Sequence, residues 1–201
     1  MEMGTGKIIY LNGISAAGKT TLTKALQARA NEPFYHVSSD VFCSYMAPKK
    51  FWDGDETVGL LLNTVKFYSD IGVNAIVDIV HVRQDGDKPD LLHKAVELLH
   101  DCPVVFVNVT CPADELRRRK IERGDQEVDK WLPYQLERFY PTGPYDIVVD
   151  THANTPEECA DGILALLEHP EKLTAFRELW VQSQGTPASS LRAVGEAVQG
   201  L

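Results

Sequence analysis

One stretch of the sequence decides the fold: Gly13-Ile14-Ser15-Ala16-Ala17-Gly18-Lys19-Thr20. It matches the phosphate-binding pattern GxxxxGK followed by Ser or Thr, and the pattern needs a strand before it and a helix after it to be specific. The apolar run IIYLN precedes it, and TTLTKALQARA, which has helical spacing, follows it. Glycines let backbone N–H groups turn around a phosphate, and the helix directs its positive end at the same oxygens. We therefore predict a phosphate-binding loop whose nucleotide contacts come from Gly13, Ser15, Ala16, Ala17, Gly18, Lys19, Thr20 and Thr21.

Two residues of this loop carry side-chain chemistry. Lys19 can reach the β- and γ-phosphate oxygens of a nucleotide, and the hydroxyl of Thr20 can bind Mg²⁺. The alternative is a glycine-rich strand–helix turn that holds no ligand, but both flanking segments favour the phosphate-binding interpretation.

The rest of the chain alternates short β-branched runs with longer segments of helical period. We predict strands at residues 7–12, 35–38, 74–80, 103–109 and 146–149, and helices at about 18–30, 56–71, 88–100, 113–123 and 156–168. Thr155 and Pro156 supply a cap and a first helical residue for the last of these helices. The pattern predicts an α/β fold of the P-loop NTPase class, with a five-stranded parallel sheet flanked by helices.

Two intervals and a tail interrupt this alternation. Residues 43–55 form an irregular excursion whose Tyr45, Phe51 and Trp52 either contact a ligand or belong to the core. Residues 124–144 are polar and broken by prolines, with a short helix possible at 128–139. We expect residues 1–169 to form the nucleotide-binding domain, with a lid at about 113–144. Residues 170–201 form a helical extension, with helices at 171–182 and 189–198, which packs on this domain or makes a dimer contact.

The composition excludes several classes of partner. The chain has 201 residues, a net charge of −9 and a pI of about 5.1, which argues against a nucleic acid partner. It shows neither a signal peptide nor an apolar run of membrane-spanning length. The four cysteines are scattered without metal-like spacing, as in a reducing compartment. We expect a soluble cytoplasmic protein without membrane contact, and a homo-oligomer stays possible.

Two aspartates are candidates for the chemistry at the carboxyl edge of the sheet. Asp40 follows the second strand in HVSSD and is suited to accept a proton from an attacking hydroxyl, or to cap the next helix. Asp78 lies in the apolar run NAIVDIVH, where a buried carboxylate needs a cation or a metal-bound water. His81 and Arg83 follow at the same edge, as secondary candidates or as a structural histidine and a solvated arginine.

The densest positive charge lies in the segment DELRRRKIERGD. Arg119 and Arg123 are four residues apart and share one helix face. Arginines on a closing lid can stabilise a transferred phosphoryl group, although a solvated charged face is the alternative.

With these residues in hand, the sequence resembles the chloramphenicol phosphotransferase-like family of P-loop kinases. The resemblance extends to about Leu167, and rests on IIYLNGISAAGKT, Asp40, the IVD that ends in Asp78, VTCPADELRRRKIERGD and the YDIVVDT that ends in Thr151. Residues 42–57 and the tail after about His169 do not match the family's pattern, so the resemblance does not identify the acceptor.

The resemblance implies a nucleotide-kinase-like fold and an ATP-dependent O-phosphotransferase that uses Mg²⁺ and a small-molecule hydroxyl acceptor. The matching positions would make Asp40 the proton acceptor and Arg119 and Arg123 the lid arginines, beside Lys19. The named member of the family phosphorylates a primary hydroxyl of an antibiotic. Two alternatives stay open: a kinase of a primary metabolite or nucleotide sugar, and a nucleotide-binding regulatory module without transfer activity.

Overall fold

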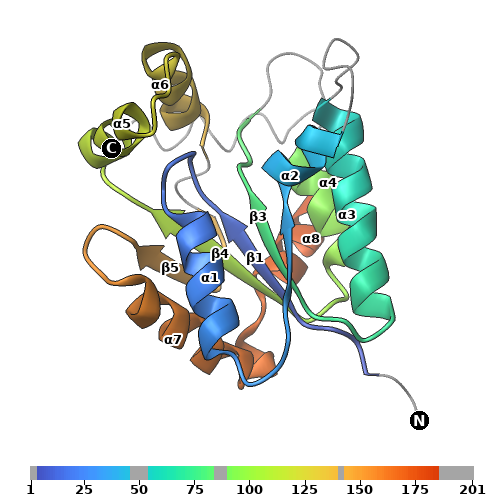
Figure 1. The fold of residues 1–201 in the computed structure, drawn as a ribbon. Helices are drawn as coiled ribbons and strands as arrows, with labels where there is room; N and C mark the ends of the chain where they lie inside the picture. Colours follow the sequence, from blue (N-terminus) through green and yellow to red (C-terminus); the bar gives the residue numbers. More distant parts are fainter. Residues whose placement is uncertain (1–3, 46–53, 84–89, 140–142, 186–201) are drawn as a thin grey trace.

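The computed structural model describes residues 4–45, 54–83, 90–139 and 143–185. Its centre is a five-stranded sheet with the order β2-β3-β1-β4-β5, in which every neighbouring pair is parallel (Figure 1). The strands are β1 (Ile8–Asn12), β2 (Tyr35–Ser38), β3 (Ala75–Ile79), β4 (Val104–Thr110) and β5 (Ile147–Asp150). The predicted five-stranded parallel sheet is confirmed.

Helices cover both faces of the sheet. The helices are α1 (Lys19–Arg29), α2 (Ser39–Tyr45), α3 (Gly54–Asp70), α4 (Leu91–Leu99), α5 (Ala113–Glu122), α6 (Val128–Arg138), α7 (Pro156–Leu167) and α8 (Ala175–Gly185), with a 3₁₀ turn at Pro170–Lys172. In Figure 1, α1 and α7 lie on one face, α3, α4 and α8 lie on the other, and α5 and α6 stand above the sheet. The helices that follow β1 and β3 therefore go to opposite faces, the arrangement that opens a crevice at the carboxyl edge of an α/β sheet.

The alternation of side chains along β1 explains why both faces are covered. Ile9 and Leu11 pack into the core under α1 and α7, whereas Ile8 and Tyr10 pack into the core under α3, α4 and α8. All four side chains are fully buried. A strand that is apolar on both sides is stable only between two layers of helices, which accounts for the run IIYL.

Helix α8 contributes to the core on the face of the sheet that α3 and α4 also cover. Phe176 contacts Tyr10 and Phe106, with ring centroids 5.2 and 5.0 Å apart. The carboxylate of Asp146 accepts hydrogen bonds from the backbone N–H of Phe106 on β4 and from those of Thr174 and Ala175 at the start of α8. One side chain thereby joins the C-terminal helix to the centre of the sheet.

The elements differ from the sequence predictions in a few places. Helix α2 was not predicted, and α3 begins two residues earlier than expected. The α7 prediction is confirmed in detail, because Thr155 and Glu158 form a capping box and Pro156 is the first helical residue. The helix predicted at 189–198 lies outside the described residues, and within them no helix is long and apolar enough to cross a membrane.

Candidate active site

The loop between β1 and α1 adopts a backbone that its sequence makes possible. Gly18 has a φ of +94°, a left-handed conformation that glycine adopts without strain, and Ala16 also has a positive φ, of 71°. At Gly13 the constraint is space, because a Cβ there would lie 2.6 Å from the carbonyl oxygen of Val109 on β4. These positions shape the loop around the N-terminal end of α1, where backbone N–H groups can bind a phosphate.

Lys19 and Thr20 start α1 and face β3. The Nζ of Lys19 donates a hydrogen bond to the carbonyl oxygen of Gly13 at 2.7 Å and lies 3.7 Å from Oδ1 of Asp78. The hydroxyl of Thr20 donates to Oδ2 of Asp78 at 2.9 Å. Lys19 and Asp78 are both buried, so the structure brings together the cation and the carboxylate that the sequence singled out.

Lys19 and Asp78 each influence the protonation of the other. Burial lowers the pKa of Lys19, although the nearby carboxylates of Asp78 and Asp40 oppose this change. Burial alone would raise the pKa of Asp78, but His36, Lys19 and Thr20 outweigh it and the pKa is lowered. Asp78 therefore stays a carboxylate at neutral pH, with the imidazole of His36 3.6 Å from Oδ2.

The pair formed by Thr20 and Asp78 fits a magnesium site. A hydroxyl and a carboxylate oxygen are hard oxygen ligands, and Mg²⁺ typically binds few protein groups while it keeps waters and phosphate oxygens. The hydrogen bond between these two side chains already holds their oxygens 2.9 Å apart, beside the phosphate-binding loop.

A cleft of about 690 Å³ opens next to this cluster at the carboxyl edge of the sheet. Asp40, the second residue of α2, lines the cleft and has an exposed side chain. Lys19, Thr20 and Asp78 line the same cleft, as does Arg123 from the end of α5. Ser15, Ala16 and Gly18 complete the contribution of the loop, whereas Gly13 and Ala17 do not line it.

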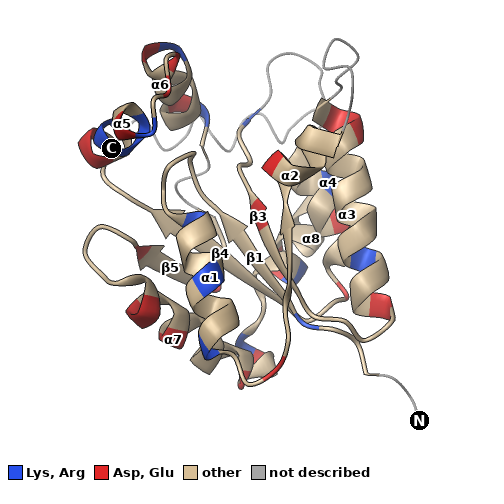
Figure 2. Cartoon of the chain, viewed as in Figure 1, with Lys and Arg blue, Asp and Glu red and all other residues tan. Residues whose placement is uncertain are grey.

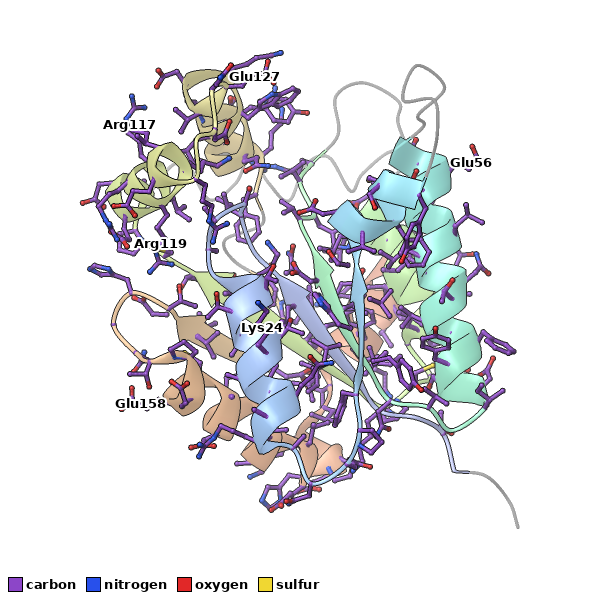
Figure 3. The ribbon with its side chains drawn as sticks, in the orientation of Figure 1. Lys24, Glu56, Arg117, Arg119, Glu127 and Glu158 are labelled. Atoms are coloured by element: carbon purple, nitrogen blue, oxygen red, sulfur yellow. The ribbon has the colours of Figure 1, made fainter. Side chains whose placement is uncertain are left out.

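Arg119 anchors α5 to the loop region rather than projecting into the cleft. Its guanidinium donates to the carbonyl and hydroxyl oxygens of Thr151, at 3.0 and 3.1 Å, and its Nε donates to Glu115 at 2.7 Å. Hydrogen bonds from Arg118 and Arg119 lower the pKa of Glu115 to about 2. Figure 3 shows Arg119 on the side of α5 nearest the N-terminal end of α1.

A second cavity, of about 190 Å³, also adjoins the loop at Gly18. Arg123 lines both cavities, and Arg119 and Thr21 line this one. Thr151 and Pro156 also line it, and sequence reasoning did not assign them a contact. The signal that could have identified Thr151 is its place at the end of YDIVVDT, because that end lies at the same edge as the loop.

The secondary candidates, His81 and Arg83, make contacts within the fold and line neither cavity. His81 is buried, its Nε2 lies 2.7 Å from the hydroxyl of Tyr10, and its backbone N–H donates to Asn12. Burial lowers the pKa of His81 to about 4, so the imidazole is neutral. Arg83 donates to the carbonyl oxygen of Glu137 on α6. Tyr45, for which the sequence left two interpretations, is 75% exposed, so it is not a core residue. Phe51 and Trp52 lie outside the described residues.

The sheet order, the loop and the buried lysine define a P-loop protein of the nucleotide-kinase type. The M. tuberculosis APS kinase, solved in complex with AMPPNP and APS, has a similar fold, with a TM-score of 0.63 at 14% identity over 82% of this chain and 99% of that one. A gluconokinase from Sinorhizobium meliloti gives a TM-score of 0.58 at 18% identity, over 89% and 98%.

The family model "chloramphenicol phosphotransferase-like protein" matches residues 6–168. A Mycobacterium tuberculosis (H37Rv) protein named "Putative O-phosphotransferase" is 30% identical over 187 residues, which cover 79% of this chain and 80% of that protein. The chain belongs to the chloramphenicol phosphotransferase-like family, as the sequence resemblance predicted. Family and fold together make it a phosphotransferase of the kinase type.

Proposed function

We propose that this protein transfers the γ-phosphate of ATP to a hydroxyl group of a small molecule. The observation that carries the proposal is the common wall of the main cleft, where Lys19 and Asp40 lie together. Lys19 can bind the phosphates of a donor nucleotide. Asp40 is a carboxylate that can accept the proton of an alcohol.

The donor half follows from the loop and the two cavities. Backbone N–H groups at the start of α1 hold the β-phosphate, and Lys19 exchanges its bond to the carbonyl oxygen of Gly13 for bonds to phosphate oxygens. The second cavity adjoins the loop on the side of Arg119 and is a suitable place for the nucleoside. Arg123, which lines both cavities, is placed to stabilise the transferred group.

The acceptor half depends on Asp40. Its carboxylate takes the proton of the acceptor hydroxyl as the oxygen forms a bond to the γ-phosphorus and the bond from that phosphorus to the β–γ bridging oxygen breaks. ADP leaves with that oxygen. Mg²⁺ held by Thr20 and Asp78 would neutralise phosphate charge and orient the oxygens. We place this reaction in the cytoplasm, and propose residues 1–169 as the catalytic domain with α5 and α6 as its lid.

Reaction of ATP, Mg²⁺ and a panel of hydroxyl-bearing antibiotics and metabolites, followed by ³¹P NMR, tests the proposal. We expect a phosphate monoester that disappears in Lys19→Ala and falls by about 10²- to 10⁴-fold in Asp40→Asn, the usual contribution of a general base. Lys24→Ala is the control, because Lys24 is exposed on the same helix (Figure 3). Full transfer by Asp40→Asn would contradict the role of Asp40, and ADP without any phosphorylated product would favour a regulatory module.

A further inference from the structure

Thr151 lies where the end of β5, the phosphate-binding loop and α5 meet. Its hydroxyl donates a hydrogen bond to the carbonyl oxygen of Ala17 in the loop at 2.7 Å, closer than the carbonyl oxygen of Thr110 at 3.3 Å. The same hydroxyl oxygen accepts a hydrogen bond from Nη1 of Arg119 at 3.1 Å. A hydroxyl has one proton and two lone pairs, so it can bond to the loop and accept from Arg119 at the same time.

The backbone of Thr151 is held independently of its side chain. Its N–H donates to the carbonyl oxygen of Thr110 at the end of β4, at 3.1 Å. Oδ1 of Asp150 accepts hydrogen bonds from the N–H groups of His152 and Ala153, at 2.8 and 3.2 Å, and so fixes the turn that follows. Loss of the hydroxyl would therefore leave the chain in place and remove only the hydrogen bonds of the side chain.

The bond to Ala17 sets the direction of an N–H group in the loop. In a trans peptide, the carbonyl oxygen of one residue and the N–H of the next point to opposite sides. By holding the carbonyl oxygen of Ala17, the hydroxyl of Thr151 directs the N–H of Gly18 away from itself. Gly18 lines the main cleft, whereas Thr151 does not, so this N–H is directed toward the side where phosphate would bind.

The bonds to Arg119 fix a cation of α5 beside the loop. Basic and acidic residues lie side by side on α5, as Figure 2 shows, and Arg117 and Arg118 form ion pairs with exposed side chains. Arg119 is only 21% exposed, and its Nη2 also donates to the backbone carbonyl oxygen of Thr151 at 3.0 Å. Because a charged donor polarises the hydroxyl that accepts from it, the bond from Arg119 strengthens the bond from Thr151 to Ala17.

From these contacts, and on the basis of the proposed function, we propose that Thr151 is a positioning residue for the phosphate donor. Its hydroxyl couples the loop, which would bind the phosphates, to Arg119, which lines the cavity suited to the nucleoside. A nucleotide then meets a loop and an arginine that are already held in one arrangement, so less ordering is needed when it binds. Thr151 acts through Gly18 and Arg119, not by contact with the transferred phosphoryl group.

The test compares Thr151→Val, which keeps the shape of the side chain but loses the hydroxyl, with Thr151→Ser, which keeps the hydroxyl. Calorimetry with the whole 201-residue chain and Mg²⁺ measures the Kd for AMPPNP, a non-hydrolysable ATP analogue, and for inorganic tripolyphosphate. We expect Thr151→Val to bind AMPPNP at least about 10-fold more weakly, because one neutral and one charged hydrogen bond are lost. Tripolyphosphate has no nucleoside to place beside Arg119, so its binding should weaken less, by about 3-fold. Thr151→Ser should bind both within about 3-fold of the unaltered protein, because it loses only the stiffness of a β-branched side chain.

Thr110→Val is the matched control, because it removes a threonine hydroxyl at the same edge of the sheet. That hydroxyl donates to the carbonyl oxygen of Val149 at 3.1 Å, and Thr110 lines neither cavity. Both Kd values should stay unchanged in Thr110→Val. Equal losses in Thr110→Val and Thr151→Val, or a Thr151→Ser variant as weak as Thr151→Val, would overturn the inference. If the unaltered protein binds AMPPNP and Thr151→Val binds it equally well, this inference alone fails, whereas no binding by the unaltered protein would overturn the proposed function as well.

The coupling itself is measured by combining Thr151→Val with Arg119→Lys. If the two side chains act through shared bonds, Thr151→Val should weaken AMPPNP binding by a smaller factor in the Arg119→Lys protein than in the unaltered one. Losses that multiply independently would show that Thr151 does not act through Arg119, and would overturn the coupling.

Discussion

The hydroxyl of Thr20 lies 2.9 Å from Oδ2 of Asp78, so the first turn of α1 is bonded to the middle of the sheet through the two oxygens that suit Mg²⁺. Neither residue reaches the other by sequence proximity, because 58 positions separate them. Parallel pairing of β3 with β1 places Asp78 opposite Leu11, just before the loop. The pair is therefore a product of strand register, and its function can be tested residue by residue.

Asp78→Asn should weaken the use of Mg²⁺. The amide keeps the size of the side chain but loses the negative charge, so we expect the Mg²⁺ concentration for half-maximal transfer to rise about 10- to 100-fold. Titration of activity with Mg²⁺ at saturating ATP measures this, and EDTA should abolish transfer by the unaltered protein. Asp161→Asn is the control, because it removes an exposed ion pair with Arg29 away from both cavities. It should change neither the Mg²⁺ concentration for half-maximal transfer nor the loss of transfer in EDTA. An unaltered Mg²⁺ requirement in Asp78→Asn would exclude the proposed metal site.

Arg119→Lys should weaken ATP binding despite keeping the charge. An ammonium group cannot reproduce the planar set of bonds to Thr151 and Glu115, so we expect the Kd for ATP to rise about tenfold, measured by calorimetry. Arg118→Lys is the control, since Arg118 makes only exposed ion pairs with Glu115 and Glu122, which contribute little. Equal affinities in the two variants would count against a nucleoside site beside Arg119.

Gly13→Ala should destabilise the fold. The Cβ of the alanine would lie 2.6 Å from the carbonyl oxygen of Val109, which is a backbone atom. Because backbone atoms cannot move aside as readily as the end of a flexible side chain, we expect a loss of about 2 kcal/mol or more in the free energy of unfolding. At Gly59, in the interior of α3, a Cβ would meet no atom within 4 Å. Gly59→Ala should instead stabilise the protein by about 0.5–1 kcal/mol through its helix propensity. Urea unfolding of both variants measures the contrast, and a neutral Gly13→Ala would disprove the close approach of loop and β4.

Acidification should destabilise the protein through His81. Burial against Tyr10 lowers its pKa from 6.5 to about 4, although Asp90 opposes the shift. Between these values the unfolded chain binds a proton that the folded chain does not, so stability falls as the pH falls from 6.5 to 4. The loss reaches about 3 kcal/mol and is complete below pH 4.

The measurement is the free energy of unfolding against pH for His81→Gln, which should show a flatter profile in this window. His152→Gln, at an exposed position, should keep the slope of the unaltered protein. A profile of unchanged slope in His81→Gln would mean that another group causes the acid sensitivity.

The sequence predicted the sheet well because its strands are apolar on both faces. Runs such as IIYLN and VVFVNV can be recognised as buried strands without knowing which strands they pair with. Helix α2 escaped prediction for the opposite reason: it has seven residues and none of them is buried, so it has no apolar stripe. Short helices of this kind are fixed by what precedes and follows them, not by their own pattern.

The donor residues were predictable, as were Asp40 and Arg123, whereas most of the remaining lining of the cleft was not. Lys19 and Thr20 belong to a contiguous motif, and Asp78 stood out as a carboxylate within an apolar run. Thr151 carries only the weaker signal of its place at the end of YDIVVDT, because its contact with a cavity depends on segments that are distant in the sequence. Its role, like those assigned to Asp40, Arg119 and Arg123, stays a prediction until the variants are made.

The contact between Tyr10 and Phe176 has a consequence for synthesis of the protein. The central strand β1 is synthesised before β2 to β5, yet Phe176, one of the aromatic rings that pack on Tyr10, belongs to the last described helix. Until residue 176 is synthesised, Tyr10 and Phe106 lack one of the aromatic rings that pack on them, although all five strands have already been made. The nascent chain therefore completes this core only after α8 has been synthesised, and we expect a chain stalled before that point to expose more apolar surface than the complete fold.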